Sequence, residues 1–409
     1  MPSTFTWLDY SEHERRKMLD VIELFGEKTT RDELGLGSVR DAFADLLFPG
    51  TSTIQTVAKY FLFVPWIYLS LEKKRTASSN IGLRARKLEI ELARQLEESG
   101  ESDGVIGRIA KEKLQRLPSS VYWQGLYQWG IRTFSGSQDE YHRSLDLFYE
   151  RQKARQSSRH EHEGESADEA DLHNWHVGLP KPNDDFPTGV TLALSFAEAE
   201  YLQERLLTTP SCSQSLMAYL VREHVEVESV PFAWELAAEL PANLSNQVLH
   251  GRNFSEVMHG AQLLYNLILA EQRDWQEKID QYREDLTDWW QQISMRMTEL
   301  RDWDRREFWR IVYQSNPRVS SRARSFIQSW IDNVTTAPAV DSIIDSKPVR
   351  QFVENREVQL KGGLARVKSE RARELWNGAA GAAQMDLRWS SARRIVADIL
   401  TGLEAEAHA

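Results

Sequence analysis

The C-terminal half of the chain carries a hydrophobic pattern that predicts long amphipathic helices. No glycine occurs between Gly260 and Gly362, and glycine is costly inside helices. Apolar residues recur there at steps of three and four, which is a heptad-like seam with one extra step. They are Trp275, Ile279, Tyr282, Leu286, Trp289, Ile293, Met297 and Leu300. We expect this seam to pack inside a helical bundle.

Two local signals set the end of one helix and the start of the next. Pro317 follows Ser315 and Asn316, and proline cannot continue a helix. Ser320 or Ser321 can then cap a helix that runs through Trp330, because a serine hydroxyl accepts from the free N–H groups of a first turn.

In the N-terminal half, Pro49 and Gly50 predict a turn, followed by the hydroxyl residues Thr51, Ser52 and Thr53. Apolar residues after them have helical spacing from Ile54 onward. Free N–H groups at a helix start can hold a phosphate, so Thr51, Ser52 and Thr53 form a phosphate-binding candidate. Ordinary N-capping uses the same residues, and the lysine of a P-loop is missing.

The segment from Asp103 to Arg132 allows a helix-turn-helix interpretation. A helix through Ile109 and Leu114 would be followed by a turn near Pro118 and by a second helix from Val121. The second helix is rich in aromatic residues, which favours packing in the core over reading of DNA bases.

These patterns predict a mainly α, multi-helical fold with several domains, since 409 residues are too many for one ordinary core. Residues 161–171 hold six acids and no lysine or arginine, which is typical of a flexible linker. The predicted order is an α or α+β domain at 1–150, an acidic linker at 151–187, a helical bundle at 188–345 and a basic helical region at 346–409.

Composition narrows the setting in which the protein works. The formal net charge of -11 argues against coating nucleic acid through bulk charge. Cys212 is the only cysteine, which excludes an intramolecular disulfide and a cysteine-based zinc site and favours the cytoplasm. The apolar run from Tyr60 to Leu71 is too short to span a bilayer, so no membrane association is expected.

Two basic regions stand out against the acidic average. Residues 59–87 hold seven basic residues and one acid, next to aromatic residues. Residues 346–403 hold eleven basic residues and six acids. Cations beside aromatic rings suit phosphate contact and base stacking, whereas the alternative is a solvated helix face paired with Glu89 and Glu91. The candidate nucleic-acid-binding residues are Lys59, Lys73, Lys74, Arg75, Arg84, Arg86, Lys87, Arg350, Arg356, Lys361, Arg366 and Lys368.

An alternative is a metal-dependent nuclease. Glu72 and Lys74 follow an apolar segment in the way that some nucleases place a carboxylate and a lysine at the end of a strand, and Asp41 or Asp45 would be the further acid for Mg²⁺. Catalytic residues are otherwise not identifiable, and we expect neither a cofactor nor a resident metal.

Four segments resemble a bacterial family described as a domain of unknown function. They begin at Arg31, Asp103, Phe254 and Val349, and they read RDELGLGSVRDAFADLLFPGTSTIQTVAKYFLFVPWIY, DGVIGRIAKEKLQRLPSSVYWQGLYQWGIR, FSEVMHGAQLLYNLILAEQ and VRQFVENREVQLKGGLARVKSERARELWNG. The resemblance implies no reaction. It implies gene neighbours of the helicase and phospholipase D-like nuclease types, in clusters similar to phage-defence islands.

The first hypothesis is therefore a non-catalytic component of a bacterial defence or DNA-processing system that binds DNA, RNA or a partner protein. The expected partner proteins are helicase-like or nuclease proteins. A structural subunit that docks on such an enzyme through a tryptophan-rich bundle is a further alternative.

Overall fold

The computed structural model describes residues 32–161 and 173–405, and this part of the chain is built from helices without a β-sheet. The mainly α, multi-helical prediction is confirmed. Most of the acidic stretch 161–171 lies outside the described residues. The described residues divide into two compact units, each made of two chain segments, whereas the predicted domains were consecutive segments.

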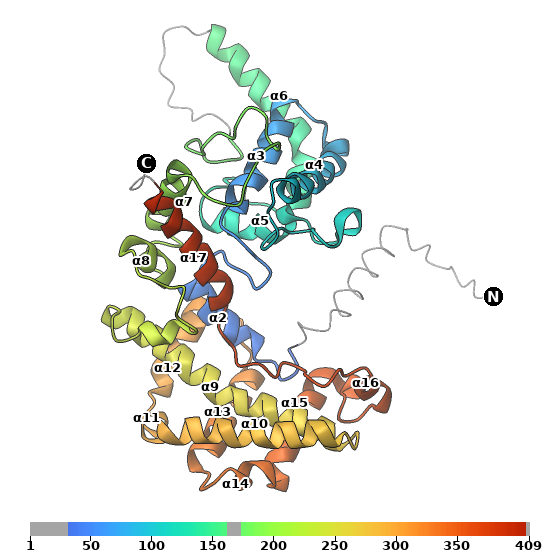
Figure 1. Ribbon diagram of the computed structural model, residues 1–409, viewed down its shortest axis with the longest axis vertical. Helices are drawn as coiled ribbons and strands as arrows, with labels where there is room; N and C mark the ends of the chain where they lie inside the picture. Colours follow the sequence, from blue (N-terminus) through green and yellow to red (C-terminus); the bar gives the residue numbers. More distant parts are fainter. Residues whose placement is uncertain (1–31, 162–172, 406–409) are drawn as a thin grey trace, which may run out of the picture. The chain divides into compact units, whose positions relative to one another are not determined.

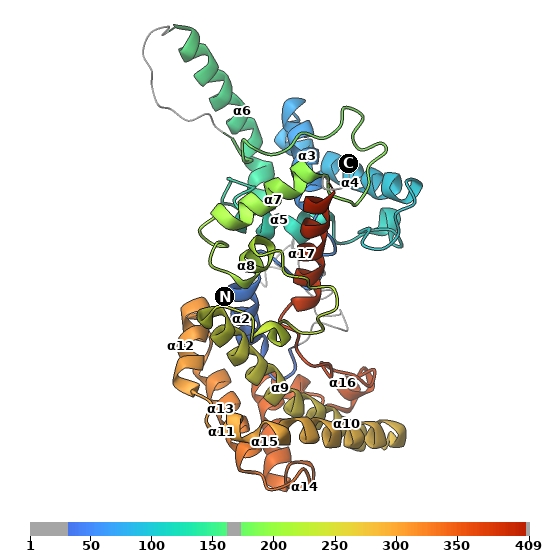
Figure 2. The same cartoon turned by 60° about the vertical axis from the view of Figure 1, so that its left-hand side comes forward.

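Unit 2 comprises, of the described residues, 43–161, 173–249 and 386–405. Its helix α3 packs on α4 and α5, and α4 packs on α6. The C-terminal α17 runs alongside α7 and α8, as Figures 1 and 2 both show. The helices of this unit are α3 (Tyr60–Lys73), α4 (Ser78–Glu98), α5 (Pro118–Gln128), α6 (Gln138–Glu161), α7 (Phe196–Thr208), α8 (Leu216–Arg222) and α17 (Trp389–Glu404), with the short 3-10 helices η1 (Lys111–Lys113) and η2 (Ala233–Leu236).

The core of unit 2 is rich in aromatic side chains. Ten residues of α3 are buried, among them Phe61 and Tyr68. The ring of Phe61 stacks on that of Trp129 with centroids 4.0 Å apart. Gly50 has φ +78°, and an added Cβ would lie 2.7 Å from the Trp129 ring nitrogen, so both the turn conformation and the close approach require glycine here.

Unit 1 comprises, of the described residues, 32–42 and 250–385. Helices α2 (Gly37–Leu47) and α9 (Ala242–Glu271) contribute residues to both units. The other helices of unit 1 are α10 (Gln276–Met295), α11 (Met297–Arg301), α12 (Arg305–Ser315), α13 (Ser321–Thr336), α14 (Asp341–Ile344), α15 (Lys347–Lys361) and α16 (Glu370–Glu374), with the 3-10 helix η3 (Gly362–Leu364).

The predicted seam of unit 1 is confirmed over most of its length. Tyr282, Leu286, Trp289 and Ile293 are the buried residues of α10, and the helix ends at Met295, where the spacing takes its extra step. The hydroxyl of Ser320 accepts from the N–H of Ala323 and caps α13, as expected from its place after Pro317.

Two local predictions are wrong. The first helix of the helix-turn-helix interpretation is replaced by turns and the single 3-10 turn η1, because Gly104 and Gly107 both have positive φ. The helix expected from Ile54 begins only at Tyr60. Tyr122 is buried on α5 and accepts from the N–H groups of Thr56 and Val57, which fixes the intervening segment as a loop.

Candidate nucleic-acid interface

Three consecutive cations extend from the C-terminal end of α3. Lys73, Lys74 and Arg75 are all exposed, and none has an ion-pair partner among the described residues. Arg75 has φ 48°, a left-handed conformation that is uncommon for a residue other than glycine. Three adjacent positive charges therefore face solvent at one place in unit 2.

Helix α4 adds two further cations to this surface. Arg84 and Lys87 are exposed and lie one turn apart, and Nη1 of Arg84 is 3.5 Å from the hydroxyl of Thr76, just after the end of α3. Arg86 points elsewhere, since its guanidinium donates to the carbonyls of Glu112 and Leu114 at 2.7 and 2.9 Å. We call the remaining five residues the basic surface: Lys73, Lys74, Arg75, Arg84 and Lys87.

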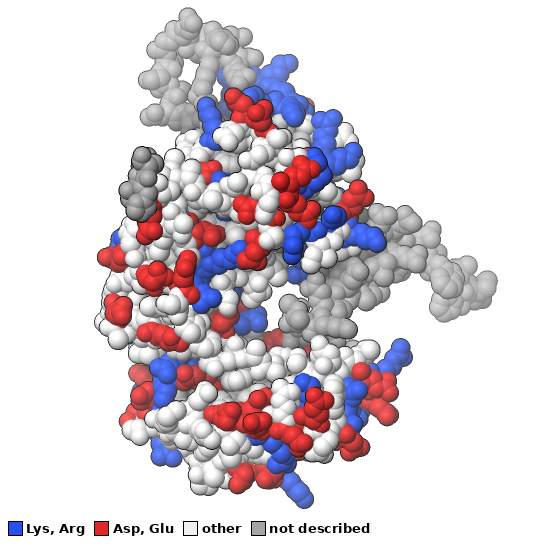
Figure 3. Space-filling view, viewed as in Figure 1, with Lys and Arg blue, Asp and Glu red and all other residues white. Residues whose placement is uncertain are grey.

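The two acids that were expected to neutralise this region, Glu89 and Glu91, interact with residues outside the basic surface. Glu89 is buried and accepts from Ser119. Glu91 pairs with Arg94 and accepts from Gln95. Neither acid therefore neutralises the cations of residues 59–87, as the interpretation of a solvated, paired helix face required. Figure 3 shows lysine and arginine side chains gathered near α4 and α6 in unit 2.

Lys59 does not belong to the basic surface, because it is only 7% exposed. Its ammonium group donates to the carbonyl of Ala193 at 2.9 Å and pairs with Glu198. A cation at the buried start of the apolar helix α3 finds a partner within the core rather than facing solvent.

Most of the candidate cations in the C-terminal region likewise form ion pairs or hydrogen bonds within unit 1. Arg356 is 3% exposed, and its Nε donates to the carbonyl of Leu34 at 2.8 Å. Arg366 pairs with Glu33 at 2.7 Å, Lys361 pairs with Glu33 and Glu357, and Arg350 pairs with Glu271. Lys368 is exposed without a side-chain partner in the described part of the chain.

The three hydroxyl residues after Gly50 do not open a helix. Thr51 is buried, and its hydroxyl donates to the carbonyl of Phe48 at 2.6 Å. The backbone N–H of Ser52 donates to the side chain of Gln55 at 3.2 Å. The helix N-terminus on which the phosphate-binding hypothesis depended is therefore missing at this place.

Glu72 lies in the last turn of α3 and not at the end of a strand, so the geometry expected for the nuclease alternative does not occur. Asp45 pairs with Arg388, and Asp41 pairs with Arg40. In residues 32–161 and 173–405, no three histidine, cysteine or acidic side chains are grouped in a way that could hold a metal ion.

Glu72 instead lines a cavity of about 360 Å³, together with Lys73 and Arg75. Its Oε1 accepts three hydrogen bonds, from the hydroxyl of Tyr141 and from side-chain N–H groups of Asn174 and Trp175, both at 3.0 Å. The described residues donate no hydrogen bond to Oε2. Burial raises the pKa of Glu72, while the three hydrogen bonds oppose that rise.

Aromatic side chains form much of the remaining wall. Tyr149 and Trp175 are buried there and Phe148 is half-buried. Burial raises the pKa of Tyr149 to about 12, so its hydroxyl stays protonated at neutral pH. Sequence reasoning missed Asn174 and Trp175, which fall in the predicted flexible linker. An isolated tryptophan within a polar segment was the one signal that this part of the chain is ordered.

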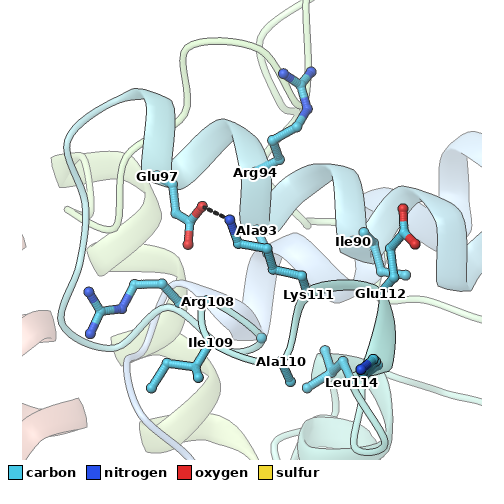
Figure 4. A pocket seen from close by; sticks show the side chains of 12 residues that line it. Ile90, Ala93, Arg94, Glu97, Arg108, Ile109, Ala110, Lys111, Glu112 and Leu114 are labelled. Carbon is cyan, nitrogen blue, oxygen red and sulfur yellow. Dashed lines mark ion pairs between the residues drawn. The ribbon is translucent and has the colours of Figure 1, made fainter.

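A larger cavity of about 560 Å³ lies between α4 and the loop that contains η1. Figure 4 shows Ile90, Ala93 and Ile109 along it, with the ion pair of Lys111 and Glu97 at 3.9 Å across one side. Its other charged side chain on α4, Arg94, pairs with Glu91 and Glu98. Arg108 and Lys113 also line this cavity, but none of its lining residues is aromatic. We therefore place the candidate site at the cavity beside Glu72, which Phe148, Tyr149 and Trp175 line.

The fold and the site define an all-helical protein, over its described residues, that carries a basic surface beside an aromatic cavity. No helix in this part of the chain has the length and apolarity needed to cross a membrane. The chain belongs to a family of unknown function (DUF6361), whose model matches residues 2–402. No curated protein and no solved structure matches it.

Proposed function

We propose that the protein binds single-stranded nucleic acid through the basic surface of unit 2. The observation that carries the proposal is the run Lys73, Lys74 and Arg75, three adjacent exposed cations without an acidic partner among the described residues, in a chain of net charge -11. Lysine and arginine bind phosphates by releasing condensed counterions, and this needs a local cluster of charge rather than a basic protein.

The aromatic cavity beside these cations favours a single strand over a duplex. The bases of a duplex are stacked and paired, whereas those of a single strand can turn toward aromatic side chains. Phe148 and Tyr149 line the cavity together with Lys73 and Arg75, so phosphates and a base would be met side by side.

Binding of labelled 12-mers of single-stranded DNA, single-stranded RNA and duplex DNA, followed by fluorescence anisotropy, tests the proposal. If three phosphates are contacted, the logarithm of affinity should fall with the logarithm of salt concentration with a slope of about -2 for a single strand. Changing Lys73, Lys74 and Arg75 to glutamate should abolish this dependence and most of the affinity.

The matched control changes Arg108, Lys111 and Lys113 to glutamate, which alters the net charge equally at exposed positions of the same unit. This variant should bind as the wild type does. An equal loss in both variants would mean that bulk charge alone governs binding, and the absence of binding to any 12-mer at low salt would refute the proposal.

We place this binding activity in a cytoplasmic component of a bacterial defence or DNA-processing system, which rests on the family resemblance and on the single cysteine. Co-expression with the helicase-like and nuclease-like products of neighbouring genes, followed by size-exclusion chromatography, tests that role. Co-elution of one of these products supports it, and separate elution of all of them contradicts it.

A further inference from the structure

The cavity beside Glu72 combines the features of a pocket for a single base. Its volume of about 360 Å³ lies within the range of small-ligand pockets, about 300–1,000 Å³. Aromatic residues line it, and Lys73 and Arg75 stand at its border. Tyr149 and Trp175 are themselves buried, so the half-buried ring of Phe148 is the aromatic surface that a flat base would meet, next to charge for the phosphate that the base carries.

The two carboxylate oxygens of Glu72 differ in their hydrogen bonds to the polar groups of the cavity. The side chains of Asn174 and Trp175 each donate one N–H to Oε1 of Glu72, and the hydroxyl of Tyr141 donates to the same atom. The described residues leave Oε2 of this carboxylate without a donor, although Glu72 lines the cavity. This oxygen is not among the buried atoms that lack a partner, so it is open to the cavity and free to accept N–H groups from a ligand.

We infer that this cavity receives one guanine, unstacked from the bound strand, whose N–H groups donate to Oε2 of Glu72; the inference rests on the proposed function. Guanine is the base with two neighbouring N–H donors, the ring imino and the exocyclic amino group, on its Watson–Crick edge. Thymine and uracil present one N–H between two carbonyl oxygens, and those oxygens are repelled by a carboxylate. Enzymes and RNA-binding proteins read extruded bases along this edge.

The surrounding charges are compatible with a guanine nucleotide. Lys73 and Arg75 come from the end of α3, and His173 lines the cavity from the segment before Trp175. Asp146 on α6 accepts from the N–H of Ser78 at 3.0 Å, which ties this acid to the start of α4. The phosphate would then meet Lys73 and Arg75, while the base edge meets Glu72.

The test measures affinities of the full chain for thymidine 12-mers with guanine, hypoxanthine or thymine at one central position. Hypoxanthine keeps the imino N–H and lacks the amino group. We expect guanine to bind about ten-fold more tightly than thymine, with hypoxanthine between them. Glu72→Gln should bring the guanine to thymine ratio to about one, since its amide would place N–H groups where the carboxylate oxygen was.

Two further variants keep the test decisive. Glu150→Gln removes an exposed carboxylate from α6 outside the cavity and should keep the guanine preference. Phe148→Ala should weaken binding of the guanine 12-mer about five-fold or more through lost contact with the base. If Glu72→Gln does not fold, the hypoxanthine series and Phe148→Ala still decide the inference.

The possible results separate the inference from the proposed function. Equal affinity for the three 12-mers overturns the guanine pocket and leaves strand binding intact, whereas failure to bind any of them overturns both. Competition by guanosine 5′-monophosphate and by thymidine 5′-monophosphate distinguishes the source of the base. Displacement by the free guanine nucleotide at the same concentration as the guanine 12-mer would assign the cavity to a free nucleotide and overturn the strand-bound guanine.

Discussion

The carboxylate of Glu89 on α4 accepts both the backbone N–H and the hydroxyl of Ser119, at 2.7 and 2.8 Å. Ser119 is the second residue of α5, so Glu89 satisfies a free N–H group of a helix start from a neighbouring helix. Burial nevertheless dominates and raises the pKa of Glu89 from 4.5 to about 7.

Because this pKa is raised, the free energy of unfolding should depend on pH. The folded state holds the proton of Glu89 more tightly than the unfolded state, so its contribution is fully present below pH 4.5 and is lost as pH rises through about 7. Glu89→Gln should therefore gain about 2–3 kcal/mol relative to the wild type between pH 5 and pH 8. Urea denaturation at the two pH values measures this difference, and parallel curves for the two proteins would contradict it. The exposed Glu150→Gln is the control.

The guanine preference should depend on pH through Glu72. Burial raises the pKa of this carboxyl, and a protonated Oε2 no longer accepts freely from guanine. We expect the guanine to thymine affinity ratio to fall on acidification, beginning above pH 4.5, the ordinary pKa of glutamate. Lys73, Arg75, Tyr149 and His173 also face the cavity, so the same titration is run on Glu72→Gln. A similar pH dependence in this variant would assign the effect to one of these groups.

Lys59 should matter for stability and not for binding. Its ammonium group and the carboxylate of Glu198 are both largely buried, with 9% and 13% of their side chains exposed. In Lys59→Met, the carboxylate of Glu198 still accepts from the backbone N–H of Ser195 at the start of α7, but it no longer has a cation beside it. We expect this substitution to lower the free energy of unfolding by about 3 kcal/mol. Lys59→Met combined with Glu198→Gln should recover part of that loss. A reduced salt slope of nucleic-acid binding in Lys59→Met would show that Lys59 contacts phosphate after all.

Glu357 should be a main support of unit 1. It is fully buried and accepts from the hydroxyl of Tyr265 at 2.7 Å, from the N–H groups of Arg366 and Val367, and from Lys361. Glu357→Ala leaves these donors unsatisfied, which should cost roughly 3 kcal/mol or more. Hydrogen exchange should show reduced protection in α9 and α15. Glu354→Ala, on the same helix and less buried, is the control, and an equal effect of both substitutions would contradict the prediction.

Gly260 should tolerate no side chain. A Cβ at this position would lie 2.2 Å from the ring of Trp289, which is itself buried and donates to the carbonyl of Glu256 at 2.8 Å. Gly260→Ala should lower the free energy of unfolding by about 1–3 kcal/mol, because the ring must move within a packed core. Gly363→Ala meets no atom within 4 Å and provides the control. Equal unfolding midpoints for the two variants would refute the prediction.

The sequence by itself was enough for features that depend on near neighbours along the chain. The seam of α10, the cap at Ser320 and the helical character of the described residues all follow from spacing and from local hydrogen bonding. The start of α3 could not be obtained in this way. Val57 and Phe61 have helical spacing, yet the hydroxyl of Tyr122, 66 residues from Thr56, takes the N–H groups that a helix would use.

Only the tertiary structure decided which charges face solvent. Lys59, Arg356 and Arg366 look like their exposed neighbours in the sequence, but each meets a partner that lies more than a hundred residues away. The cavity has the same origin, since Glu72 meets Asn174 across 102 residues of chain. Periodicity reports which face of a helix is apolar, whereas the partner of a buried charge is set by packing between segments that are distant in sequence.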